Sequence, residues 1–169
     1  MPVSRVALAA LVLLLPSFAA AQAATPTPAP TPAAAVTADA ALSEAIRERI
    51  DHLRYELQHD HADHDVDGER IVLGETVARY YESQQFRPQW RDPARLDRLI
   101  ASLFGLLDDG LDPTDYHVEV LQTYRTKFRR TQALPPAEQA GLEVLATDAL
   151  ILGLSHLYLG KVNPEKLSS

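Results

Sequence analysis

The residues with the clearest capacity for chemistry lie in one polar run from His59 to Gly68, which reads HDHADHDVDG. The run holds three imidazoles, at His59, His61 and His64, together with four carboxylates. Imidazole suits zinc, copper or nickel in an exported protein, but a flexible loop loses conformational entropy when it is ordered around an ion. The run therefore has two interpretations, a metal site and a solvated acidic loop, and we assign no metal ligand within it.

Part of the same run resembles the beginning of a calcium-binding loop. Asp63, Asp65, Asp67 and Gly68 match the early positions of such a loop. The twelfth position should be a glutamate that binds calcium through both carboxylate oxygens, and here it is Gly74. We therefore do not expect a calcium site.

Residues that suit catalysis are scarce in this sequence. There is no cysteine, which excludes disulfides and a cysteine nucleophile within these residues. No serine lies in a nucleophile-elbow pattern, and no glycine-rich phosphate loop is present. His117 and His156 each stand alone, and such histidines are more often packed or solvated than catalytic. We assign no catalytic or cofactor-binding residue and no cofactor, and leave open whether the chain is an enzyme.

The first 21 residues have the pattern of a secretory signal peptide. Arg5 provides a positive charge, an apolar run extends from Val6 to Leu15, and Pro16 interrupts it. The small residues Ala19 to Ala21 fit signal-peptidase cleavage before Gln22, and Ala21-Gln22-Ala23 is a second candidate, with cleavage before Ala24. The apolar run is too short for a membrane-spanning helix. We therefore expect residues 1–21 to be removed and the rest of the chain to be periplasmic; an uncleaved anchor is the alternative.

The charge balance restricts the partners of the exported chain. The whole sequence carries 16 Lys and Arg against 23 Asp and Glu, a net charge of −7, and removal of Arg5 with the signal makes it −8. Nucleic-acid binding depends on neutralising phosphates with Lys and Arg, and anionic membrane surfaces also attract cations. We therefore expect no nucleic-acid partner and, after signal cleavage, no membrane partner.

The remaining residues divide into a linker and one helical domain. Residues 22–41 are rich in Pro and Ala and predict a disordered linker, whereas residues 42–169 are long enough for a domain with its own core. Apolar residues at three- and four-residue spacing predict a first helix from Leu42 to Gln58 and a short second helix from Gly74 to Gln84.

Explicit start and stop signals define three further helices. Asp92-Pro93 predicts the start of a third helix, which Gly110 closes. The same device at Asp112-Pro113 predicts a fourth helix from Pro113 to about Arg129. The last predicted helix, Pro136 to Leu159, is apolar on most sides and should lie centrally in the bundle. The sequence thus predicts an all-α domain of about five helices.

Three segments resemble the scaffold domain of the large periplasmic L,D-transpeptidases. Tyr80 to Trp90 is similar to its "FY-x-x-R-x-F-x-P-x-W" stretch, although glutamine replaces the usual arginine. Gly110 to His117 is similar to "GL-x-P-x-DYH". Leu145 to Ala149, followed by His156 to Pro164, is similar to "LTDA … HL-x-x-GRVDP", with one inserted alanine and with Lys161 and Asn163 in place of arginine and aspartate. All three occur in the family's order.

The resemblance implies a function in the cell wall. Enzymes of this family cross-link peptidoglycan stems through a cysteine acyl-enzyme, but this sequence has no cysteine. It also stops where the family would continue into a peptidoglycan-binding module and a catalytic domain. The resemblance therefore implies a non-catalytic scaffold portion, with peptidoglycan or an L,D-transpeptidase catalytic domain as its partner. It implies structural roles for its motif residues, namely Tyr81, Phe86, Trp90, Gly110, Asp112, Pro113 and Gly160.

Two alternatives remain from the sequence. The chain could be a standalone periplasmic adaptor or binding protein that docks a cell-wall enzyme, or a metal-binding protein that uses His59, His61 and His64. A domain that braces a neighbour should expose an apolar patch when it is isolated. We expect such a patch on the helix from Pro136 to Leu159.

Overall fold

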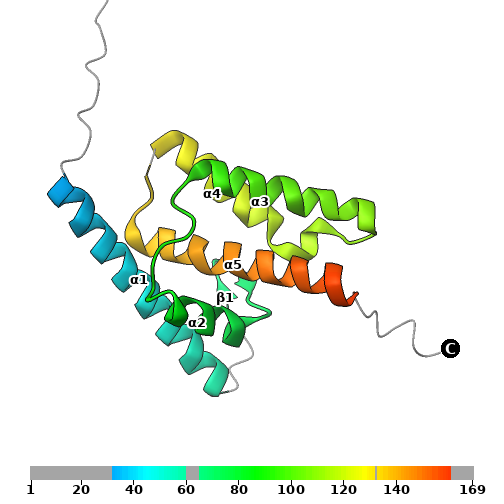
Figure 1. Ribbon diagram of the computed structural model, residues 1–169, viewed down its shortest axis with the longest axis horizontal. Coiled ribbons are helices and arrows are strands. Elements are labelled where there is room, and N and C mark those ends of the chain that lie inside the picture. Colours follow the sequence, from blue (N-terminus) through cyan, green and yellow to red (C-terminus); the bar gives the residue numbers. More distant parts are fainter. Residues whose placement is uncertain (1–31, 60–64, 132, 161–169) are drawn as a thin grey trace, which may run out of the picture. The chain divides into compact units, whose positions relative to one another are not determined.

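The computed structural model describes residues 32–59, 65–131 and 133–160, so the predicted signal peptide and the first part of the predicted linker lie outside the described residues. Within these ranges the chain forms five α-helices, two 3-10 helices and one two-stranded antiparallel hairpin (Figure 1). The prediction of an all-α domain is therefore confirmed.

Helix α5, Pro136–Leu159, is the centre of the domain. It contacts each of the other four helices, and Figure 1 shows α1 and α2 on one side of it and α3 and α4 on the other. By length and composition α5 is the one described helix that could cross a membrane, but 56% of the relevant stretch is buried inside the protein. Its central position, predicted from its apolar faces, accounts for this composition.

Helix α1, Pro32–Gln58, packs along α5 through a buried stripe that includes Leu42, Ile46 and Ile50. The helix begins ten residues before the predicted start at Leu42, so residues 32–41 are helical and not a disordered linker. Proline is favoured in the first helical turn, and alanine has the highest helix propensity. Pro32 therefore begins the helix, and the alanines that follow it extend the helix to Leu42.

Helices α2 and α3 follow their predicted bounds closely. Helix α2 is Gly74–Ser83, and α3 is Pro93–Gly105, with the Asp92 side chain capping its first turn. A 3-10 helix, η1 (Leu106–Asp109), continues α3 to Gly110, whose φ of 75° is left-handed. Gly110 thus stops the helix as its sequence position predicts.

The predicted fourth helix is divided into two. A 3-10 helix, η2, spans Pro113–Tyr116 and is capped by Asp112. His117 then has a left-handed φ of 56°, and α4 follows as Val118–Thr131. The prediction of one continuous helix from Pro113 was wrong, because the conformation of His117 is not helical and is set by contacts that are distant in sequence.

A small hairpin precedes α2, and its first strand lies in the polar run for which the sequence left open a metal site or a solvated acidic loop. Strand β1 (Asp65–Val66) pairs with β2 (Glu69–Arg70), in the register Asp65 with Arg70 and Val66 with Glu69. The two turn residues both have positive φ, as the Asp-Gly pair at Asp67 and Gly68 favours. Val66 is buried, so the hairpin is part of the packed domain.

Candidate functional site

The polar residues of the core gather on α5. Gln139, Glu143, Thr147 and Asp148 are all buried there, and Glu143 and Asp148 have no exposed surface. A buried carboxylate is strongly unfavourable unless hydrogen bonds compensate for its lost hydration. The partners of these two carboxylates therefore identify the contacts that matter most to the domain.

Glu143 accepts hydrogen bonds from the loop that joins α2 to α3. The backbone N–H groups of Gln89 and Trp90 donate to its two carboxylate oxygens, at 2.7 and 2.9 Å, and the hydroxyl of Tyr81 donates at 2.7 Å. Burial raises the pKa of the Glu143 carboxyl above its usual value, although these donors act to lower it. The carboxylate fixes the course of the loop, since each of its oxygens has a partner on that segment.

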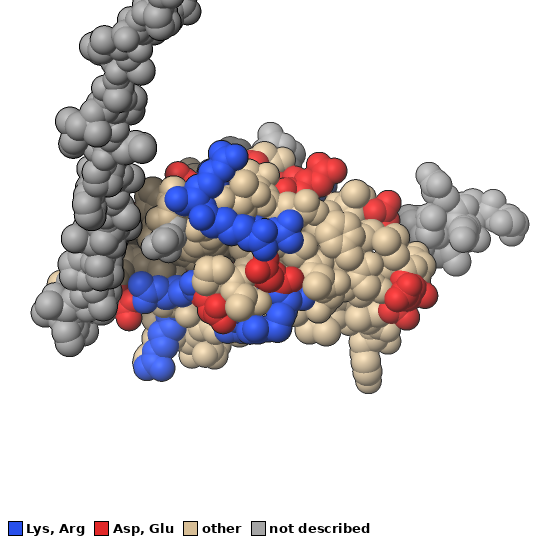
Figure 2. Space-filling model, turned by 90° about the horizontal axis from the view of Figure 1, so that it is seen from above, with Lys and Arg blue, Asp and Glu red and all other residues tan. Residues whose placement is uncertain are grey.

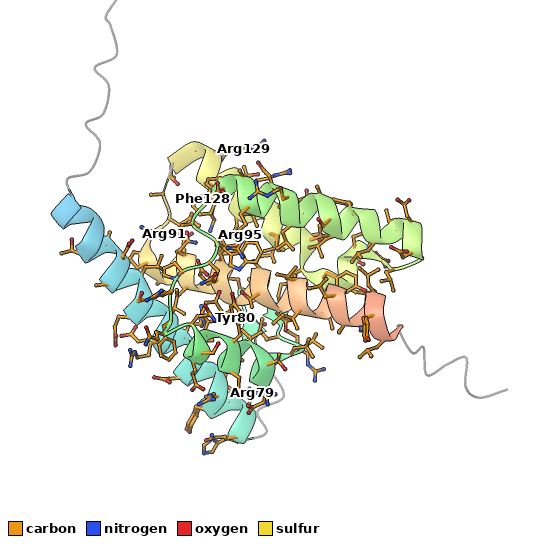
Figure 3. All side chains as sticks on the ribbon, viewed as in Figure 1. Arg79, Tyr80, Arg91, Arg95, Phe128 and Arg129 are labelled. Carbon is orange, nitrogen blue, oxygen red and sulfur yellow. The ribbon has the colours of Figure 1, made fainter. Side chains whose placement is uncertain are left out.

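Thr147 joins the same network one helical turn further along α5. Its hydroxyl lies 2.9 Å from the Tyr81 hydroxyl and accepts a 2.9 Å bond from the Trp90 indole N–H. Burial, with the nearby charge of Glu143, raises the pKa of Tyr81 well above 10, so its hydroxyl stays protonated. The guanidinium of Arg95, a residue labelled in Figure 3, lies 4.9 Å from the centre of the Trp90 ring. Tyr81 and Trp90 are thus core anchors that carry polar contacts as well as apolar surface.

The loop that follows α2 also has an unusual backbone. Gln85 and Phe86 both have positive φ, and the Phe86 N–H donates to the Tyr81 carbonyl at 2.8 Å to close the helix. Phe86 is partly buried, and the Arg47 guanidinium of α1 lies 4.6 Å from its ring centre. The first family-like motif therefore encodes a helix stop and a turn that directs Trp90 toward α5.

Asp148 forms a second cluster with His117. Oδ2 of Asp148 lies 2.9 Å from His117 Nε2, and Glu69 Oε2 lies 3.0 Å from His117 Nδ1. Asp148 also accepts the backbone N–H groups of Val72 and Leu73, at 3.1 and 2.8 Å, just before α2. The cluster ties the hairpin, the entrance of α2 and the junction of η2 with α4 to the central helix.

The two carboxylates set the protonation of His117. Burial acts to lower the pKa of this imidazole, but hydrogen bonds and charge from Asp148 and Glu69 outweigh burial and raise it above 6.5. The doubly protonated ring donates from both nitrogens. In many enzymes a histidine that is oriented by a carboxylate acts as a general base. Here carboxylates contact both ring nitrogens, so neither nitrogen is free to take a proton from a substrate. The geometry therefore suits a structural role, in which His117 holds the hairpin and the start of α4 against α5.

The other residues considered from the sequence have separate positions. His156 Nδ1 lies 2.9 Å from the Tyr116 hydroxyl, and His59 Nδ1 lies 2.8 Å from the Tyr55 carbonyl. His61 and His64 lie outside the described residues, so the metal-loop hypothesis is untested. In the described part of the chain, no group of three or more His, Cys, Asp or Glu side chains is placed to hold a metal ion.

Asp65 and Asp67, two of the carboxylates that resemble a calcium-binding loop, form hydrogen bonds within or beside the hairpin. Asp65 Oδ1 accepts the Gly68 N–H at 2.5 Å, and Asp67 accepts the hydroxyl of Tyr124 from α4. Burial and Asp67 raise the pKa of Tyr124. These contacts give both carboxylates a structural partner without an ion.

Gln139 and Glu143 were not among the residues predicted from the sequence, whereas Thr147 and Asp148 lie in the third family-like motif. Gln139, Glu143 and Thr147 follow each other at four-residue spacing and so share one helix face. A charged side chain such as Glu143 within the most apolar helix was the available signal, because it can be buried there only with partners.

Comparison with known proteins adds one match. A family model described as "Scaffold domain" matches residues 75–169, which is more than half of the chain and includes all three motifs. The resemblance noted from those motifs is therefore confirmed. No curated protein and no solved structure matches the chain.

Proposed function

Because the chain belongs to the Scaffold domain family, we propose that it is the non-catalytic scaffold portion of a periplasmic murein L,D-transpeptidase, which takes part in peptidoglycan cross-linking. One observation carries this proposal: residues from all three motifs are used inside the domain. Tyr81 and Trp90 of the first motif and His117 of the second contact α5 at Glu143, Thr147 and Asp148. The last two of these belong to the third motif.

Such a network suits a part that holds other parts in position. A hydrogen bond that involves a charged group contributes roughly 1.5–3 kcal/mol, and the two buried carboxylates accept several each. The bonds fix the loop after α2, the hairpin and the start of α4 against one helix. A domain with fixed surface geometry can orient an attached or associated enzyme toward its polymer substrate.

The chemistry of cross-linking is assigned to a different segment. The L,D-transpeptidases whose scaffold domain the motifs resemble react through a cysteine acyl-enzyme, and this sequence has no cysteine. The role proposed for the chain is therefore to position a catalytic domain or to contact the wall. The amino-terminal signal pattern supports a site of action in the periplasm.

The proposal is tested with residues 22–169 as a purified protein. The first measurement is capture of a separately expressed L,D-transpeptidase catalytic domain, and the second is co-sedimentation with purified peptidoglycan. The third is the yield of cross-links between diaminopimelate residues made by the catalytic domain with and without the scaffold chain. Emission from Trp90, the sole tryptophan, confirms in each case that the protein is folded.

We expect binding to the catalytic domain or to the wall, and a higher cross-link yield when the scaffold chain is added. A folded protein that binds neither and leaves the yield unchanged would contradict the proposal. A matched control is a catalytic domain whose nucleophilic cysteine is replaced by alanine. It should still be captured, since docking does not require the reaction, but it should form no cross-links.

A further inference from the structure

The last two turns of α5 expose large apolar side chains. Leu154, Leu157 and Tyr158 are 56%, 47% and 89% exposed, respectively. Their three- and four-residue spacing places them on one helix face, and we call these three residues the terminal patch. Figure 1 shows this end of α5 beyond the part that α1 and α2 cover.

A shallow apolar groove adjoins the terminal patch. It holds about 80 Å³ between α5 and the end of α3, and its lining includes Leu103, Leu106 and Gly153 as well as Leu154 and Leu157. A methyl group at Gly153 would make ordinary van der Waals contact with Leu106, at 3.4 Å. Exposed apolar side chains gathered around a groove provide the apolar surface that a docked partner would cover.

The surroundings of the terminal patch are acidic. Asp109 lines a hollow together with Leu157, and Asp108 is exposed beside it. The sequence has no Lys or Arg between Arg98 and Arg125, nor anywhere in α5. Figure 2 shows acidic side chains at this end of the molecule, whereas Lys and Arg gather toward the other end. The end of the groove at the terminal patch is therefore apolar with a negative rim, formed by Asp108 and Asp109. The opposite end, at Leu99, Ser102 and Leu150, adjoins Arg95 and Arg98.

We propose that the terminal patch and its groove dock an amphipathic helix whose apolar face is flanked by Lys or Arg. The inference rests on the proposed function only for the source of that helix, which is the catalytic domain that the scaffold positions. Apolar anchors of a helix fit a groove between two helices, and the aspartates attract cations beside them. An anionic membrane would be repelled by the same rim.

The test measures binding of two labelled 14-residue peptides to residues 22–169 by fluorescence anisotropy. One is an amphipathic leucine–lysine helix, and the other has glutamate at every lysine position. We expect the lysine peptide to bind at least about tenfold more tightly, because its charges complement the rim. The double substitution Leu154→Gln and Leu157→Gln should weaken its binding by at least about tenfold.

Matched variants separate the terminal patch from general effects. Val72→Gln removes a side chain that is equally exposed, at 55%, but lies before α2, and it should leave binding unchanged. Asp108→Asn with Asp109→Asn should weaken binding of the lysine peptide and reduce its salt dependence. Glu48→Gln with Asp51→Asn changes the total charge equally on the exposed side of α1 and should have little effect. Trp90 emission checks the fold of each variant.

Several results would overturn the inference. Two of them concern affinity for the peptides: equal binding of both peptides, or an equal loss of lysine-peptide affinity in the terminal-patch and Val72 variants. A third is an equal loss of that affinity in the two charge variants. The fourth is a concentration-dependent dimer that the terminal-patch variant abolishes. The catalytic domain, tested in the same assay, separates the two proposals. If it binds the Leu154/Leu157 variant as well as the wild type, the docking inference fails and the scaffold role stands. If the lysine peptide recognises the terminal patch but the catalytic domain does not bind, the scaffold role fails.

Discussion

Nε2 of His117 lies 2.9 Å from Oδ2 of Asp148, and the carboxylate of Asp148 also accepts two backbone N–H groups at the entrance of α2. This contact links the second family-like motif to the third across 31 residues of sequence. It also makes the fold sensitive to the charge of one imidazole, because a neutral ring has one N–H for two carboxylates.

The first prediction concerns pH. The pKa of folded His117 is raised above 6.5, because its bonds to Asp148 and Glu69 outweigh the effect of burial. Its contribution to stability is therefore complete below pH 6.5 and is lost as the pH rises through the folded pKa. Each unit of pKa difference corresponds to about 1.4 kcal/mol. Urea unfolding followed by Trp90 emission between pH 6 and 9 should show this decline.

The variants for this experiment are His117→Gln and His52→Gln. His117→Gln should flatten the decline, whereas His52→Gln should not, since His52 is exposed on α1, where it lies beside Glu56. If His117→Gln fails to fold, an NMR titration of the wild-type imidazole gives the same information. An imidazole that titrates at or below 6.5 would contradict the prediction.

The second prediction concerns the carboxylate of Asp148. Asp148→Asn removes one acceptor oxygen, so either a backbone N–H before α2 or His117 loses its partner. Leaving such a group buried without a partner should lower the free energy of unfolding by about 2–4 kcal/mol. Asp51→Asn, on an exposed face of α1, should change it by less than about 0.5 kcal/mol.

Hydrogen exchange locates the Asp148 effect. In a folded Asp148→Asn protein, the amide protons of Val72 and Leu73 should exchange faster, because they donate to this side chain. Exchange in the middle of α3 should change no more than global stability requires. Unchanged protection at Val72 and Leu73 would show that the carboxylate does not hold this segment.

The helices were predictable because their signals are local. Asp92-Pro93 and Gly110 mark a start and a stop through their own conformational preferences, and the structure places both where the sequence did. Helix α5 runs from Pro136 to Leu159 as predicted. Periodicity and caps depend on residues a few positions apart, so one sequence suffices to read them.

The buried network was not predictable, because its contacts are remote in sequence. Glu143 and Tyr81 are 62 residues apart, and nothing near either residue indicates the other. The left-handed His117 follows from the same cause, since the carboxylates that hold it come from the hairpin and from α5. Because these partners are remote in sequence, the local pattern predicted a continuous helix through His117.

The third prediction compares two adjacent tyrosines. The Tyr81 hydroxyl bonds to Glu143 and Thr147 in the buried network, whereas Tyr80 is only partly buried against the core and its ring packs edge-on against that of Tyr81. Tyr81→Phe removes a donor to a buried carboxylate and should cost about 1–3 kcal/mol. Tyr80→Phe should change the free energy of unfolding by less than about 0.5 kcal/mol.

Urea unfolding of both variants at one pH makes this comparison. Each substitution removes a single oxygen from the same helix, so loss of packing cannot account for a difference between them. Equal effects of the two substitutions would show that the Tyr81 hydroxyl contributes no more to stability than the hydroxyl of the partly buried Tyr80. Trp90 emission should also shift in Tyr81→Phe alone, since the indole shares Thr147 with Tyr81.

The last prediction concerns Gly141 in α5. A methyl group there would lie 2.8 Å from the Tyr124 hydroxyl and 3.2 Å from Oδ2 of Asp67, the two groups that join α4 to the hairpin. Gly141→Ala must therefore displace that contact, and overpacking of this kind costs about 1–3 kcal/mol. Gly105→Ala is the matched control, because it meets nothing within 4 Å and has helical φ and ψ. It should stabilise the protein by about 0.4–1 kcal/mol by restricting the unfolded chain.

Thermal unfolding of the two alanine variants should thus move the midpoint in opposite directions. The loss in Gly141→Ala should be largely relieved when Tyr124→Phe is added, because the phenolic oxygen is the nearest atom to the new methyl group. The two substitutions would then be strongly non-additive, as expected for residues in direct contact. Additive losses would show that the helix can shift to admit the methyl group, and that close approach of the hairpin to α5 does not require glycine.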